Sequence, residues 1–272
     1  MVSVVPSQMP QVRDDITRFC SSGYLAALLD EHRALHGQYE LPLPEAEMPW
    51  HSALGSYQQR LLAMAGKATL YHVPAQTIPA INIARSQMRE HQLRAEDLPA
   101  DQGLILFDAP INRLNQTPSA TMPPRRQPGH DDQHTDRQPP LASVVGVLWG
   151  LAKRADGRPG VLTVLWSDTS ELADHDQHNG DADLAAKRRE IAGLVSYHDE
   201  AVLAFGDIYS NQCPPGETAA RHDALVALIC TWSLMRQPNT CELAPMPRQV
   251  RRRFARQGKP LPHVRIVTTQ DR

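Results

Sequence analysis

The sequence has few cysteines, and their positions exclude two classes of small stabilised domain. Cys20, Cys213, Cys230 and Cys241 are the only four in 272 residues. They are too scattered for a disulfide framework, and no C-x-x-C or Cys/His pair has the spacing of zinc ligands. We therefore expect reduced thiols, most of them buried in the core.

Long apolar runs are missing as well. The longest candidate, residues 143–152, is about half of the roughly 18 to 20 residues that a membrane-spanning helix needs. The first fifteen residues lack the basic region followed by a sustained apolar stretch that marks a signal peptide. These features predict a cytoplasmic protein without a membrane partner.

Aromatic residues are scarce, at 5%, whereas proline is abundant, with 23 residues. This balance predicts many loops and a core of Leu, Val, Ala and Ile. The length suits one large domain or two small ones.

No motif of adequate specificity for catalysis is present. G-x-S-x-G, the P-loop, G-x-G-x-x-G and H-E-x-x-H are all absent. The polar segment 168–183 contains Asp174, Asp176 and His178, which could ligate a divalent ion, but the segment fails the EF-hand pattern because Asn179 stands where Gly is needed. We interpret it as a solvated acidic loop and predict no metal site and no cofactor. The group Tyr197 to Glu200 could serve in acid/base chemistry, although we expect a surface turn there.

Apolar periodicity predicts six helices. The first should break near residues 21–23, and the helix 217–237 should be buried on more than one side. Arg85 and Arg89 should face water on the third helix, as should Arg188 on the fourth. The six ranges are 11–36, 53–65, 79–93, 182–195, 217–237 and 247–257.

Residues 142–166 give the clearest strand signal. The segments ASVVGVLWGL (142–151) and GVLTVLW (160–166) are rich in Val, Leu and Trp, and turn residues separate them. Neither alternates with polar residues, so both faces of this hairpin should be covered. We predict an α+β fold whose mixed, mostly antiparallel sheet has this hairpin at its centre and helices on its flanks. The other predicted strands are 69–73, 103–107, 201–208 and 263–269.

Residues 113–140 differ in composition from the rest of the chain. They contain many prolines, no aromatic residue and almost nothing apolar to bury, which predicts a disordered loop or linker. The chain then divides into a helical region with short strands, 1–112, and an α+β core, 141–272. Whether these two parts form one domain remains open at this point.

The C-terminal residues 247–272 hold eight Lys/Arg and one acid, whereas the rest of the chain holds 20 basic and 29 acidic residues. On a helical wheel of 248–256, Val250 and Phe254 fall on one side and most arginines on the other, with Arg253 at the edge. Two apolar anchors would dock this helix while the cations face water. The predicted anion-binding residues are Arg248, Arg251, Arg252, Arg253, Arg256 and Lys259.

Three stretches carry a resemblance to a known family. They are GLILFDAPI (103–111), VVGVLWG with VLTVLWS (144–167), and TWSLMRQP followed by RQVRRRFARQGKPLPHVRIV (231–267). Over about residues 60–270 the chain resembles a family of uncharacterised proteins from high-GC bacterial genomes and their phages and plasmids. The resemblance implies an accessory protein of a mobile element and supplies no activity or site.

These observations favour a non-enzymatic protein whose arginine helix contacts a nucleic-acid backbone or another polyanion. Two alternatives stay open. The same helix could bind an acidic protein partner, as in an inhibitor or interaction protein, or the chain could be an enzyme with an unrecognised metal site at residues 174–178. The sequence leaves the partner, the choice between DNA, RNA and protein, any substrate and the oligomeric state undetermined.

Overall fold

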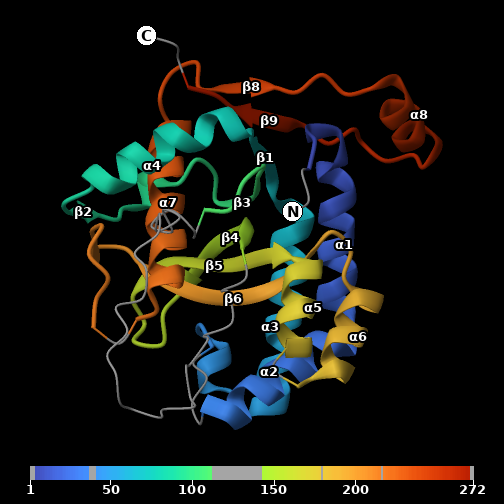
Figure 1. The fold of residues 1–272 in the computed structure, drawn as a ribbon, viewed down its shortest axis with the longest axis vertical. Coiled ribbons are helices and arrows are strands. Elements are labelled where there is room, and N and C mark those ends of the chain that lie inside the picture. Colours follow the sequence, from blue (N-terminus) through green and yellow to red (C-terminus); the bar gives the residue numbers. More distant parts are fainter. Residues whose placement is uncertain (1–3, 37–40, 112–142, 179, 216, 270–272) are drawn as a thin grey trace, which may run out of the picture.

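Helices pack on both faces of a seven-stranded mixed sheet in the computed structural model of this chain (Figure 1). The structure describes residues 4–36, 41–111, 143–178, 180–215 and 217–269. The predicted α+β class is confirmed. None of the helices in the described ranges combines the length and the apolar character required to cross a bilayer.

The large sheet has the strand order β6-β5-β4-β3-β1-β9-β8. Strand β1 runs parallel to both β3 and β9, and every other neighbouring pair is antiparallel. The strands are β1 (Thr69–Val73), β3 (Gln102–Phe107), β4 (Val144–Lys153), β5 (Pro159–Asp168), β6 (Val195–Ala204), β8 (Cys241–Leu243) and β9 (Val264–Val267). A separate two-stranded sheet pairs β2 (His91–Gln92) with β7 (Ile208–Tyr209).

The helices divide between the two faces of the large sheet (Figure 1). Helices α1, α2 and α3 cover one face, whereas α4 and α7 cover the other. The helices are α1 (Met9–Ser21), α2 (Gly23–His36), α3 (Trp50–Lys67), α4 (Ile78–Gln87), α5 (Thr169–His178), α6 (Ala182–Ile191), α7 (Ala219–Met235) and α8 (Arg248–Arg256). A short 3-10 turn, Pro6–Gln8, precedes α1, and three more lie between the helices, at Glu45–Glu47, Ala75–Thr77 and Ala95–Asp97.

The predicted central hairpin is confirmed as β4 and β5, which pair antiparallel between β3 and β6. Covered faces explain its lack of polar alternation, since nearly every side chain from Gly160 to Asp168 is buried. Gly103 on β3 lies opposite Trp149 on β4, and a Cβ atom at this position would come within 2.2 Å of the indole ring. The close approach requires glycine there.

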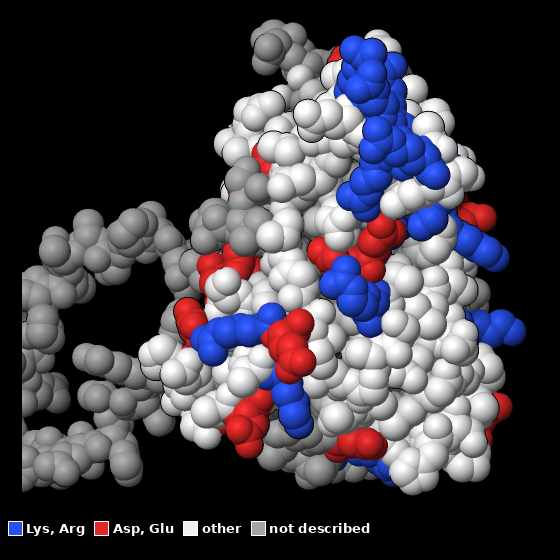
Figure 2. All heavy atoms as spheres, turned by 90° about the vertical axis from the view of Figure 1, so that its right-hand side faces the viewer, with Lys and Arg blue, Asp and Glu red and all other residues white. Residues whose placement is uncertain are grey.

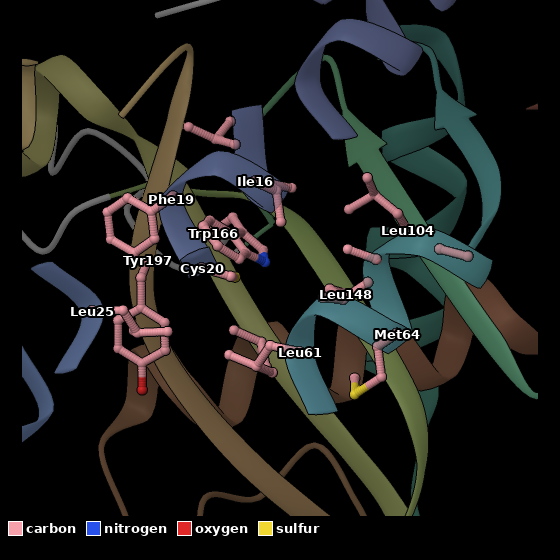
Figure 3. Packing of buried hydrophobic residues seen from close by; sticks show 14 of the residues in the cluster. Ile16, Phe19, Cys20, Leu25, Leu61, Met64, Leu104, Leu148, Trp166 and Tyr197 are labelled. Carbon is pink, nitrogen blue, oxygen red and sulfur yellow. The ribbon is translucent and has the colours of Figure 1, made fainter. Parts of the chain in front are cut away.

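Aromatic rings organise the core between the sheet and helices α1 to α3 (Figure 3). Phe19 on α1 meets Trp166 on β5 edge to face, with ring centroids 5.7 Å apart. Ile16 and Leu61 pack beside them and are fully buried. On the opposite face, Trp232 of α7 is the corresponding central residue. Each face of the sheet therefore has its own apolar layer.

Strands from both regions of the chain lie in the large sheet. Strands β1 and β3 come from the region 1–112, and the remaining strands come from 141–272. All seven share one hydrogen-bonded sheet, so the two regions share their hydrophobic cores. The predicted linker 113–140 lies outside the described residues.

Two arginines that the sequence assigns to the surface are buried, for the same reason. Arg85 is buried and its Nη1 lies 3.3 Å from Asp223 Oδ2 on α7. Arg188, expected in water on α6, is also buried, against Asp176. In both cases an acid from another element neutralises a cation that a single-helix wheel assigns to the surface. The predicted acidic loop is wrong as well, because Asp176 belongs to α5, a helix within that polar stretch.

Candidate polyanion-binding surface

Helix α8 lies at the far end of the excursion between β8 and β9, away from the main body of the sheet (Figure 1). Pro247 is the residue before its first turn, where a missing N–H costs nothing. At the other end Gly258 has a φ of 62°, and the N–H of Lys259 donates to the carbonyl of Phe254 at 3.1 Å. The predicted helix and its glycine stop are therefore confirmed.

The apolar side of α8 holds the helix in place. Phe254 is 4% exposed and Val250 is half-buried, as the wheel predicts. Arg253 adds a polar contact to α1, because its Nη2 donates to Gln11 Oε1 at 3.0 Å and lies 3.6 Å from Asp14 Oδ2. Arg253 thus lies at the edge of the cationic face, with its side chain 47% exposed and in contact with α1.

The other five cations expected to bind anions are exposed. No ion pair or hydrogen bond joins their side chains to any residue that the structure describes. They are Arg248, Arg251, Arg252, Arg256 and Lys259. Figure 2 shows a continuous basic band at the top of this face, over α8, with most of the acidic side chains of the view below it. The arrangement keeps strong positive potential on one projecting ridge.

Sequence reasoning found the cations of this surface but not its polar anchor. Gln11 and Asp14 lie more than 230 positions before Arg253, and nothing in their local pattern distinguishes them from other polar residues of α1. By charge alone, Arg253 is indistinguishable from the neighbouring arginines of α8. Only the tertiary contact separates its role from theirs.

The alternative metal site at 174–178 is not assembled. Residues 174 and 176 diverge by about 200° on a helix, so their carboxylates point apart. Asp174 Oδ1 lies 2.8 Å from Arg189 and Asp176 Oδ2 lies 2.7 Å from Arg188. Within the described ranges, no three His, Cys, Asp or Glu side chains are placed to hold a metal ion.

The group Tyr197 to Glu200 lies inside strand β6 and not in the surface turn that the sequence predicts. Glu200 is buried and accepts a hydrogen bond from the hydroxyl of Tyr57. A register irregularity between β5 and β6 accommodates His198, whose Nδ1 lies 3.0 Å from Ser167 Oγ. Ser167 is fully buried, which shields its hydroxyl from any substrate in water.

The environment of His198 makes stability depend on pH. Burial lowers the pKa of its imidazole, the charges of Arg188 and His175 lower it further, and Asp199 opposes them. The folded protein therefore binds this proton less readily than the unfolded chain does. The stability that depends on neutral His198 is fully present above a pH of about 6.5 and is lost as the pH falls below that value. We expect the free energy of unfolding to fall between pH 7 and 5, and His198→Asn to reduce that slope by up to about 1 kcal/mol per pH unit. Urea titrations at several pH values measure both slopes, and identical slopes would contradict the assignment to His198.

Comparisons of this chain with protein-family models, with curated proteins and with solved structures found no match.

Proposed function

We propose that this protein contacts a nucleic-acid backbone, or a polyanion of the same charge density, through the exposed face of α8. The observation that carries the proposal is the set of five exposed cations on α8 and its C-terminal end, which have no acidic partner among the described residues. We propose an accessory role in a mobile element as the setting, which the resemblance to a phage and plasmid family supports.

Two features of the helix support this function. Guanidinium groups form charge-assisted, often bidentate hydrogen bonds with phosphate oxygens, and four of the five cations are arginines. Phe254 also packs against the protein and Arg253 contacts α1, so the position of the helix and of its other cations is set before binding. A prepositioned site loses less conformational entropy when it binds.

Charge counting gives the expected salt dependence. Binding that neutralises about four phosphates of a duplex gives a plot of log K against log salt with a slope of about −3.6, from about −0.9 for each phosphate. The double substitution Arg252→Ala with Arg256→Ala should flatten this slope by about 2 and weaken binding similarly across sequences. Fluorescence anisotropy with labelled duplexes from about 50 to 200 mM salt measures both quantities.

A matched control removes two cations elsewhere. Arg94 and Lys153 are exposed and lie outside α8, and their double replacement by Ala changes the net charge equally. We expect the control to keep a slope near that of the unmodified protein, while Val250 and Phe254 keep the folding of the first variant intact. Absence of binding at about 50 mM salt would reject the proposal and favour an acidic protein partner, because phosphate contacts are strongest at low salt.

A further inference from the structure

The exposed side of α8 has the form of a ridge with cations on both flanks. At about 100° per residue, the cationic arc extends from Arg251 to Arg256 over about 140°, with Arg248 and Ala255 near its middle. Val250 and Phe254 lie on the opposite side, toward the protein. Arg248 therefore lies nearest the middle of the arc, and Ala255 and Arg252 lie about 30° from the middle on either side.

The surface lacks the groups that bind unpaired bases. Single-stranded nucleic acids are held by aromatic rings on which bases stack. Across the part of the chain that the structure describes, no Phe, Tyr or Trp ring is exposed, and only Trp50, Phe205 and Tyr209 among them are half-buried. None of these three belongs to α8, whose single aromatic residue, Phe254, is buried.

Size and shape distinguish between the two kinds of duplex. A nine-residue helix is about 13 Å long, and the B-form major groove, about 12 Å wide, admits an α-helix. The major groove of A-form RNA is deep and narrow, and protein side chains do not read it. A helix that projects from the body of the protein, as α8 does in Figure 1, can enter the wider groove.

Resting on the proposed function, we infer that the partner of α8 is B-form DNA, with the helix seated in the major groove. Arg248, Ala255 and Arg252 then face the groove floor, while Arg251 on one flank and Arg256 on the other approach the phosphates of opposite strands. Because the flank contacts are made to phosphates, they make binding depend on duplex form and not on base sequence.

Three labelled probes of one sequence test this inference: duplex DNA, duplex RNA and single-stranded DNA. We expect duplex DNA to bind about tenfold or more tightly than either of the others at the same salt concentration. Methyl green, which occupies the major groove, should displace the protein, whereas netropsin, which occupies the minor groove, should not.

A pair of acidic substitutions tests the seating of the helix. Ala255→Glu places a carboxylate within the cationic arc, about 30° from its middle, and Gln257→Glu places the same charge about 160° away, at the exposed end of the helix. Both change the net charge equally and both lie near the negative end of the helix dipole. We expect the Ala255 variant to weaken DNA binding about tenfold more than the Gln257 variant, with melting temperatures that stay close to each other.

The outcomes separate the two proposals. Equal binding of the three probes, or equal loss in the two acidic variants, would overturn the groove inference and leave backbone binding by α8 intact. Binding to none of the probes at about 50 mM salt would reject backbone binding itself, and the groove inference with it.

Discussion

Replacement of Trp232 by Ala is expected to lower the free energy of unfolding by about 3 to 5 kcal/mol. The indole is fully buried on α7, and its ring meets Trp149 of β4 with centroids 5.6 Å apart. Truncation removes this contact and leaves a cavity between the helix and the sheet, which the central hairpin cannot close without breaking its pairing with β3 and β6. Denaturant unfolding followed by circular dichroism measures the loss.

Trp232→Phe is the matched control. The indole Nε1 is a buried donor without a hydrogen-bond partner among the described residues, so the phenyl ring removes an unsatisfied polar group together with part of the packing. We expect this variant to lose about 1 to 2 kcal/mol, well below the loss in the Ala variant. An Ala variant with an unchanged melting temperature would show that α7 contributes little to the core, in conflict with its buried position.

Elements whose own apolar residues indicate their burial were predictable from the sequence. Helix 217–237 is apolar on nearly every side, and the structure buries twelve residues of α7. The hairpin 142–166 is apolar without alternation and occupies the middle of the sheet. In both segments the residues expose so much apolar surface that they must be buried, whichever element packs on them.

Elements that depend on partners far away in sequence were not predictable. Helix α5 is polar along most of its length, and its position depends on Arg188 and Arg189 of α6. The three-residue strand β8 exists because β9 lies beside it. For the candidate site, the wheel identified the apolar anchors Val250 and Phe254 but could not assign the partner of Arg253 on α1.

Arg188 and Arg189 are adjacent in sequence, but their environments differ in a way that the local sequence does not indicate. Replacement of Arg188 is expected to cause the second large loss of stability. Arg188 Nε donates to Asp176 Oδ2 at 2.7 Å, and its Nη1 donates to Ser196 Oγ at 2.7 Å and to the carbonyl of Tyr197 at 3.0 Å. The guanidinium and the carboxylate are both buried. Arg188→Ala should therefore cost about 3 to 5 kcal/mol, because it leaves a buried carboxylate without its counter-charge.

Arg189→Ala is the control on the neighbouring residue. Arg189 makes the same kind of pair across the same two helices, with Nη2 2.8 Å from Asp174 Oδ1, but its side chain is 45% exposed and that of Asp174 is 65% exposed. Water already screens both charges, so the loss should be at most about 1 kcal/mol. Urea unfolding of the two variants at the same pH compares them directly.

The double substitution Arg188→Met with Asp176→Leu identifies the cause of the loss. If the cost in Arg188→Ala comes from the stranded carboxylate, removal of both charges in favour of apolar side chains should restore a large part of the stability. Ser196 Oγ and the Tyr197 carbonyl still lose their donor, which keeps the recovery incomplete. Equal losses in Arg188→Ala and Arg189→Ala would mean that the Arg188 pair is exposed to water in solution, and α5 would then be only loosely attached to β6.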